Sequence, residues 1–375
     1  MNDQLVGELS VIGMLGSEDF IAKVDAYLRE WRGSESYLIT PEMIRFGTGE
    51  GKCVLRNTVR GHDIYIFADF FNWGVTFKMY GQDIPMSPDD HFADLKRIIG
   101  AIMGKARRVT VIMPMLYEGR QHRRTLRESL DCAMMLQELV KIGVSNIITF
   151  DAHDARVQNA IPLSGFDDVR TTYQMIKALL NNVPDISLDS NNLMVISPDE
   201  GGIGRCMYLA SILELELGMF YKRRDYSVIK NGKNPIVEHK FLGSDVHGHD
   251  IIIVDDMISS GESVLTIAAH LKKMGARRVF AFVSFGLFTS GLEAFDKAYE
   301  NKIIDKIFTT NLIYRNPALK EREWYVEVDL TKYVAYIIDT LNRDSTISKL
   351  LDPSERINKF IHKWEEEKNQ TKLDI

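Results

Sequence analysis

The sequence has few cysteines and no long apolar run. Its three cysteines, Cys53, Cys132 and Cys206, share no metal-like spacing, which is typical of a protein from a reducing compartment. Apolar runs such as residues 279–283 are far shorter than the roughly 18 residues that a membrane-spanning helix requires. The sequence also lacks the basic start and long apolar core of a signal peptide. These absences predict a cytoplasmic protein with no membrane partner.

A strong excess of one charge sign is also missing. The chain carries 46 Lys and Arg residues against 52 Asp and Glu residues, a formal net charge of −6 at pH 7. A protein that wraps a polyanion such as DNA is usually basic, so nucleic acid is not an expected partner. With 375 residues, of which 45% are hydrophobic, the chain is long enough for about two domains of ordinary size.

The most informative segment is residues 251–275, in which a strand, a polar loop and a helix are predicted to follow one another. Four β-branched residues at 251–254 predict a strand that is buried on both faces, as in a parallel sheet. Apolar side chains then recur at helical spacing from Val264 to Leu271. Gly275 is placed to end that helix.

The loop between this strand and helix has the composition of a phosphate-binding turn. Its residues are Ser259, Ser260, Gly261, Glu262 and Ser263. Their backbone N–H groups can face one anion at the N-terminus of the helix. Asp255 and Asp256, just before the loop, are candidates to bind the hydroxyls of a sugar. The alternative is an ordinary turn in which Ser259 caps the helix and Glu262 completes a capping box.

An internal repeat organises the chain. Residues 61–69 (GHDIYIFAD) resemble residues 248–256 (GHDIIIVDD), and a helical pattern then leads to Ala-Arg-Arg-Val in both copies. From the last Asp to that Ala the spacing is 37 positions in the first copy and 20 in the second, so the first copy has 17 extra residues. Their Pro and Gly residues predict an irregular loop at residues 70–89. One strand–helix–strand unit is therefore predicted to occur twice.

Strands and helices are predicted to alternate along the rest of the chain, which indicates two α/β domains with mainly parallel sheets flanked by helices. Thr125 and Glu128 form a capping-box pattern that predicts the start of one helix. The further predicted strands are residues 109–113, 146–150, 193–196 and 217–220, and the further helices are residues 125–142, 204–215 and 353–368.

Two basic clusters are candidate phosphate-binding sites. Arg120, Arg123 and Arg124 share a loop, and Arg binds phosphate oxygens in a bidentate manner. Residues 222–224 (Lys-Arg-Arg) follow an apolar strand, so they should lie at the carboxyl edge of the sheet, where ligands of α/β proteins collect. The alternatives are a solvated basic helix entry for the first cluster and a charged strand terminus for the second.

Two acidic turns also follow predicted strands. Asp151, His153 and Asp154 offer two carboxylates and an imidazole, a combination that can hold a divalent metal. Residues 197–202 (Ser-Pro-Asp-Glu-Gly-Gly) form a Gly-rich turn with acids that suits a metal or a sugar. The alternatives are a structural histidine in the first turn and a simple capped turn in the second.

Together these stretches resemble the ribose-phosphate pyrophosphokinase (phosphoribosyl pyrophosphate synthase) family. The matching landmarks follow the family's order, at residues 45–50, 120–121, 151–153, 197–202, 222–224 and 255–263. The resemblance implies an α/β fold of tandem duplicated phosphoribosyltransferase-like domains. Residues 1–175 would form the ATP side, residues 176–340 the ribose 5-phosphate side, and residues 341–375 a helical extension.

The resemblance also implies a reaction, a cofactor and an assembly. The diphosphoryl group of ATP would pass to the 1-hydroxyl of ribose 5-phosphate, giving phosphoribosyl pyrophosphate and AMP for nucleotide biosynthesis. Mg²⁺ would be required. Because the family builds its adenine site across subunits, a homo-oligomer based on dimers, such as a hexamer, is expected.

Site residues are carried over position by position. ATP binding is expected of Phe46, Thr48, Gly49, Glu50, Arg120 and Gln121, and Mg²⁺ binding of His153 and Asp199. Ribose 5-phosphate binding is expected of Arg224, Asp255, Asp256, Ser259, Ser260, Gly261, Glu262 and Ser263. Lys222 and Arg224 are expected to be catalytic. The Lys222 ammonium would stabilise the charge that develops on the transferred group.

The sequence departs from the family pattern at four positions. Thr48, His122 and Ser259 each replace an Asp, and Glu262 replaces a small residue, so Glu262 is expected to point away from the phosphate. Two other functions therefore stay open. One is a catalytically inactive regulatory homologue of the synthase, and the other is a phosphoribosyltransferase. Residues 231–235 are expected to form a lid loop.

Overall fold

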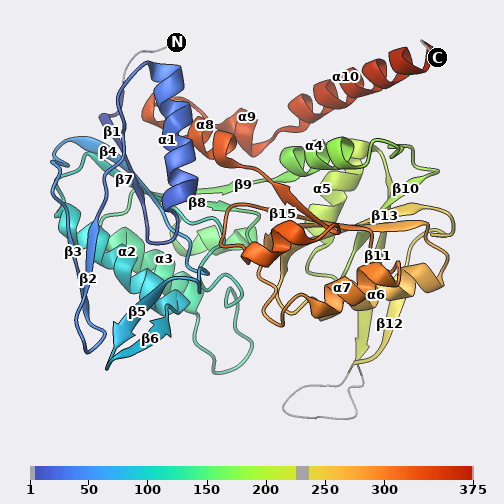
Figure 1. Ribbon diagram of the computed structural model, residues 1–375, viewed down its shortest axis with the longest axis horizontal. Coiled ribbons are helices and arrows are strands. Elements are labelled where there is room, and N and C mark those ends of the chain that lie inside the picture. Colours follow the sequence, from blue (N-terminus) through green and yellow to red (C-terminus); the bar gives the residue numbers. More distant parts are fainter. Residues whose placement is uncertain (1–4, 225–235, 374–375) are drawn as a thin grey trace. The chain divides into compact units, whose positions relative to one another are not determined.

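The structure, a computed structural model, describes residues 5–224 and 236–373 of the chain (Figure 1). It contains two units, each with its own sheet and buried core. The first unit comprises Met1–Thr171, Asn311–Tyr314 and Asp329–Asp352, and the second comprises Thr172–Thr310, Arg315–Val328 and Pro353–Ile375. The domain limits at residues 175 and 340 stay a prediction, and the lid expected at residues 231–235 lies outside the described residues.

The sheet of the first unit has the strand order β1-β4-β7-β8-β9, and every neighbouring pair is parallel. Its strands are β1 (Glu8–Gly13), β4 (His62–Phe67), β7 (Arg108–Ile112), β8 (Asn146–Phe150) and β9 (Gly165–Val169). Every residue of β4 is buried, as expected for a central strand that is covered on both faces. The strands predicted at residues 109–113 and 146–150 are confirmed.

Helices cover both faces of this sheet (Figure 1). One face carries α2 (Pro88–Ile102) and α3 (Asp131–Lys141), and the other carries α1 (Glu18–Arg32) packed against α8 (Thr331–Asn342). Asn342 Nδ2 donates a hydrogen bond of 2.9 Å to Asp63 Oδ2 in the buried interior of the unit. This bond fixes α8 to β4 across a long sequence separation. Short helices η1 (Ala155–Ala160) and α9 (Ser348–Leu351) complete the unit.

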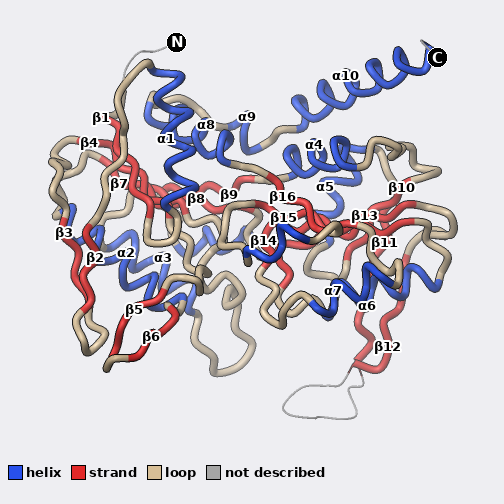
Figure 2. The backbone as a smooth tube through the Cα atoms, viewed as in Figure 1, coloured by secondary structure: helices blue, strands red, loops and turns tan. Residues whose placement is uncertain are grey.

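Two antiparallel hairpins belong to the first unit (Figure 2). The first pairs β2 (Glu42–Arg45) with β3 (Gly51–Val54), and the second pairs β5 (Thr76–Met79) with β6 (Gln82–Pro85). The prediction of an irregular loop at residues 70–89 is therefore wrong, because most of this insertion forms the second hairpin and the start of α2. Its sequence lacks the Asn-Gly turn that most clearly marks a hairpin.

The sheet of the second unit has the order β12-β11-β10-β13-β14-β15-β16, and only the edge pair β11/β12 is antiparallel. Its strands are β10 (Leu193–Ser197), β11 (Glu216–Arg224), β12 (Ile236–Leu242), β13 (Asp250–Ile258), β14 (Arg278–Gly286), β15 (Lys306–Thr310) and β16 (Tyr325–Val328). The strands predicted at residues 193–196 and 217–220 are confirmed. The strand predicted at residues 251–254 runs on to Ile258.

The second sheet is also covered on both faces (Figure 1). α6 (Glu262–Lys273) and α7 (Glu293–Glu300) lie on one face, and α4 (Thr172–Asn182) and α5 (Ile203–Leu213) on the other, with α10 (Ser354–Leu373) beside α4 and α5. A short helix, η2 (Pro317–Glu321), precedes β16. None of the described helices is both long and apolar enough to cross a membrane.

One predicted helix start is wrong, and so is the alternative in which Ser259 caps the helix after β13. The helix predicted from Thr125 begins at Asp131, since the buried apolar positions start only at Cys132 while Leu126 is 79% exposed. Thr125 and Glu128 form only a local 3.4 Å contact ahead of it. Ser259 does not cap α6, because Gly261 occupies the N-cap and no side chain completes a capping box.

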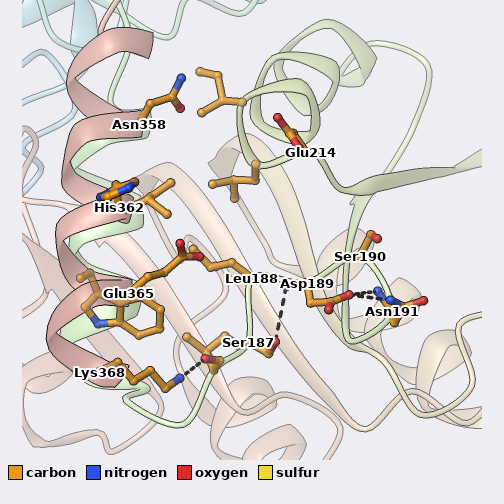
Figure 3. Close-up of a pocket in the computed structure, with 15 residues that line it drawn as sticks. Ser187, Leu188, Asp189, Ser190, Asn191, Glu214, Asn358, His362, Glu365 and Lys368 are labelled. Carbon is orange, nitrogen blue, oxygen red and sulfur yellow. Dashed lines mark hydrogen bonds between the residues drawn. The ribbon is translucent and has the colours of Figure 1, made fainter. Parts of the chain in front are cut away.

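The helix predicted at residues 353–368 is confirmed as part of α10, with Ile357 fully buried. Beside α10 lies a groove of about 830 Å³ that α5 and the segment from Ile186 to Asn191 also line (Figure 3). Its side chains are mostly polar and include Asp189, Glu214 and Glu365. Lys368 Nζ donates to the carbonyl of Ile186 at 2.8 Å across one end of the groove.

Candidate active site

The three ligand-binding stretches predicted in the second unit lie at one edge of its sheet. β10, β11 and β13 are adjacent and parallel, so their carboxyl ends meet at the same edge. Residues 197–202 begin at the last residue of β10, residues 222–224 end β11, and residues 255–263 span the end of β13 and the start of α6. The backbone of Lys222 and Arg224 pairs with β12 at His239 and Ile236.

The turn from β13 to α6 is shaped by Gly261. Its φ of 88° is left-handed, and a Cβ there would lie 2.1 Å from Cζ of the buried Phe295, so only glycine fits. The side chains of Ser260, Glu262 and Ser263 are exposed around it. The turn therefore presents hydroxyls and backbone N–H groups at the N-terminus of a twelve-residue helix, where positive potential favours an anion.

Asp255 and Asp256 occupy the last part of β13, and Arg205 of α5 binds both. Arg205 Nη1 lies 2.6 Å from Asp256 Oδ1 and 3.2 Å from Asp255 Oδ1. Burial, followed by the negative charge of Asp256, raises the pKa of Asp255 well above its usual range, and Arg205 opposes that rise. Arg205 was not predicted from the sequence. Its position in the first helical turn after Gly201 and Gly202 could have indicated that it lies near the site.

Asp199 stands in the turn after β10. Its Oδ1 accepts hydrogen bonds from the backbone N–H groups of Gly201 at 3.0 Å and Gly202 at 3.2 Å. This arrangement closes the turn just before α5 and leaves the carboxylate half-buried at the sheet edge. A carboxylate in this position is a suitable oxygen ligand for Mg²⁺.

The predicted arginine loop and the His153 turn of the first unit follow the carboxyl ends of β7 and β8. Arg120 and Gln121 follow β7, and the exposed His153 follows β8. The rings of His153 and His122 have centroids 5.3 Å apart. The structure thus brings the arginine loop and the His153 turn together within this unit.

The acids that flank His153 have protein partners. Asp151 Oδ2 accepts a 2.5 Å bond from the hydroxyl of Thr171. Asp154 pairs with Arg156, whose hydrogen bond lowers the pKa of Asp154 to about 2 against the opposing effect of burial. Among the residues described, no three His, Cys, Asp or Glu side chains form a complete metal site. Mg²⁺ often takes only one or two protein ligands together with substrate phosphates, so binding of Mg²⁺ by His153 in the first unit and by Asp199 in the second stays a prediction.

The predicted adenine loop, residues 46–50, joins β2 to β3. Phe46 is 48% exposed, and its N–H donates to the carbonyl of Glu50 at 2.8 Å. The hydroxyl of Thr48 donates to Glu50 Oε2 at 2.9 Å. Arg45 links the loop to α2. Its Nη1 donates a hydrogen bond to the carbonyl of Gly49 at 3.1 Å, and its Nη2 donates one to Asp94 Oδ2 at 2.8 Å.

Comparison with known proteins identifies the family. A model described as the N-terminal domain of ribose phosphate pyrophosphokinase matches residues 9–143, and one described as a phosphoribosyl transferase domain matches residues 167–313. The chain belongs to the ribose-phosphate pyrophosphokinase family. The family and the tandem α/β fold predicted from the sequence are thereby confirmed.

Curated members of the ribose-phosphate pyrophosphokinase family align over most of the chain. The protein of Mycoplasma genitalium is 30% identical over 283 residues, which cover 74% of this chain and 77% of the relative. That of Vibrio parahaemolyticus is 27% identical over 313 residues, 82% of this chain and 90% of the relative. The crystal structure of phosphoribosylpyrophosphate synthetase from Mycobacterium smegmatis has the same fold, with a TM-score of 0.73, 18% identity, and coverage of 90% of this chain and 100% of that one.

Proposed function

We propose that the chain transfers the diphosphoryl group of ATP to the 1-hydroxyl of ribose 5-phosphate, giving phosphoribosyl pyrophosphate and AMP. The observation that carries the proposal is the shared sheet edge of the second unit. At this edge β13 ends in the pair of aspartates and the Ser-Gly turn at a helix N-terminus, and β11 ends in Lys222 and Arg224. The two strands lie on either side of β10, and all three are parallel. Family membership supports the same reaction.

Ribose 5-phosphate would bind in the second unit. Its phosphate takes the turn of Ser259, Ser260, Gly261, Glu262 and Ser263, where N–H groups and hydroxyls can donate to the phosphate oxygens. Its ring hydroxyls donate to Asp255 and Asp256, with Arg224 as a further contact. Glu262 is exposed and opens α6, so its carboxylate can turn toward solvent and away from the phosphate.

ATP would bind through the first unit. In this proposal the adenine is surrounded by Phe46, Thr48, Gly49 and Glu50, which in a homo-oligomer come from the neighbouring subunit. The phosphates of ATP are contacted by Arg120 and Gln121. His153 and Asp199 are each expected to bind Mg²⁺, which would offset the charge of the phosphates. Lys222 is the group expected to stabilise the negative charge that develops during transfer.

A direct assay tests the proposal. The purified full chain is incubated with ATP, ribose 5-phosphate and Mg²⁺, and AMP and phosphoribosyl pyrophosphate are quantified. The expected result is equal formation of both products, dependent on ribose 5-phosphate. No AMP from a folded protein would favour the inactive regulatory homologue. Consumption of phosphoribosyl pyrophosphate in the presence of free bases would favour a phosphoribosyltransferase instead.

A further inference from the structure

The β5–β6 hairpin, which lies within the insertion, packs against the predicted adenine loop. The N–H of Tyr80 at the hairpin tip donates to the carbonyl of Gly47 at 2.9 Å. A Cβ at Gly49 would lie 2.8 Å from Sδ of Met79, so the loop backbone packs directly against this hairpin. Figure 2 shows the two hairpins of the first unit.

Arg45 links the same two elements through its guanidinium group. Its Cζ lies 4.6 Å from the ring centroid of Phe77 in β5, while its Nη1 donates to the carbonyl of Gly49. The hairpin of the insertion therefore packs directly against the loop that carries Phe46.

Tyr80 has an unusual backbone conformation for its residue type. Tyr80 and Gly81 form the two-residue turn between the paired residues Met79 and Gln82, with φ values of 49° and 80°. A turn with both φ values positive favours Asn-Gly, and a bulky side chain is disfavoured in the left-handed region. The residue is also 80% exposed. Neither turn propensity nor packing within the chain accounts for a tyrosine here.

We propose that the Tyr80 ring binds the base of the nucleotide, as a second aromatic surface beside Phe46. The inference rests on the proposed function, which assigns ATP to the loop of residues 46–50. Phe46 and Tyr80 are held next to each other by the bond between Tyr80 and Gly47, and both are exposed. An exposed aromatic ring held in a strained turn is suited to stacking on a flat base.

The test compares two substitutions that separate the ring from the turn. Tyr80→Asn removes the ring but suits the turn better, so the variant should be at least as stable as the wild type. Tyr80→Phe keeps the ring. Lys78→Gln alters an exposed ion pair with Asp83 on the same hairpin and serves as the matched control. For each protein the Kd of ATP is measured by titration calorimetry, the KM of ATP by AMP formation, and the oligomeric state by light scattering.

Loss of one stacking contact should raise the Kd and KM of ATP roughly 5- to 150-fold in Tyr80→Asn. Tyr80→Phe and Lys78→Gln should match the wild type, and all variants should keep its oligomeric state. A wild-type Kd in Tyr80→Asn overturns the inference. So does weaker binding that comes with a changed oligomer, because Tyr80 would then act as a subunit contact.

The Kd of ATP measured by calorimetry tests the role of Tyr80 independently of the proposed reaction. If the wild-type chain binds ATP but forms no AMP, the proposed reaction fails while the Kd of Tyr80→Asn still decides the role of Tyr80. If the wild-type chain does not bind ATP, the Tyr80 inference is overturned.

Discussion

Arg205 binds Asp256 at 2.6 Å, and the same nitrogen lies 3.2 Å from Asp255. The side chains of Arg205 and Asp256 are 16% and 4% exposed. Burial raises the pKa of Asp255 well above its usual range, and repulsion from the adjacent Asp256 adds to that rise. One guanidinium therefore keeps both acids available to a ligand that donates hydrogen bonds.

Replacing Arg205 should weaken the binding of ribose 5-phosphate. In Arg205→Met the uncompensated aspartates would repel the sugar phosphate, and the loss of charged hydrogen bonds should raise its KM about tenfold or more. The KM of ATP should change little, and the thermal midpoint should fall because a buried charge loses its partner. Initial rates and a thermal scan check this.

The double variant Arg205→Met with Asp256→Asn provides the control, since removing one carboxylate relieves the repulsion. Its thermal midpoint should recover part of the loss. If Arg205→Met alone keeps the wild-type KM and thermal midpoint, Arg205 does not organise the two aspartates.

Lys222→Ala should abolish turnover without unfolding the chain. Loss of a donor that stabilises transition-state charge typically lowers the rate about a hundredfold or more. AMP formation at saturating substrates is the measurement, with circular dichroism to check folding. Lys240→Ala, which removes an exposed lysine from the neighbouring strand β12, is the control and should be fully active. Near-normal turnover by Lys222→Ala would remove this lysine from the mechanism.

The local parts of the site could be read from the sequence. The strand, the Ser-Gly turn and the helix of residues 251–275 depend on neighbours in the chain: β-branched residues, a glycine that alone tolerates its φ, and apolar side chains at helical spacing. Each signal is contained in a short window, which is why the strand, the turn and the helix lie at the residues that the sequence predicts.

The contacts that could not be predicted from the sequence are those between segments that lie far apart in the chain. Arg205 reaches Asp256 because β10 and β13 are neighbours in the sheet, and no short window contains that order. Asn342 returns to Asp63 for a similar reason. The β5–β6 hairpin was missed because its turn uses Tyr80 where a sequence pattern would require Asn.

Thr48 should relax the choice of nucleotide. Its hydroxyl donates to Glu50, whereas the Asp that the family resemblance places here would accept from the adenine amino group. We expect the wild type to use GTP nearly as well as ATP. Thr48→Asp should raise the ratio of kcat/KM for ATP over GTP about tenfold.

Thr48→Asn is the control for that change, because an amide can both donate and accept and so distinguishes the two bases less well. Rates with ATP and GTP are measured for all three proteins. An unchanged ratio in Thr48→Asp would show that this position does not read the base.

Asp154 should make the first unit sensitive to acid. Its pKa is lowered to about 2, chiefly by the hydrogen bond from Arg156. A carboxyl whose pKa is lower in the folded state stabilises the fold above its unfolded pKa of about 4, and this contribution is lost as the pH falls toward 2. Because Arg156 is 79% exposed, solvent screens the ion pair and its contribution to stability is small.

Arg156→Gln should therefore lower the urea midpoint at pH 7, and the difference from the wild type should shrink below pH 4. Arg107→Gln, at an exposed position of the same unit, gives the background effect of losing a surface arginine. A deficit in Arg156→Gln that is the same at pH 7 and pH 3 would contradict the assignment to Asp154.

Ile357 should anchor α10 to the second unit. Its side chain is fully buried, the guanidinium of Arg356 lies 4.2 Å from the ring centroid of Tyr173 in α4, and the Phe360 ring packs edge-on against the same tyrosine. Ile357→Ala should cost about 2–4 kcal/mol of unfolding free energy, measured by calorimetry. Lys359→Ala, at an exposed position of the same helix, should cost only a few tenths. A wild-type midpoint for Ile357→Ala would mean that α10 adds nothing to the stability of the unit it contacts.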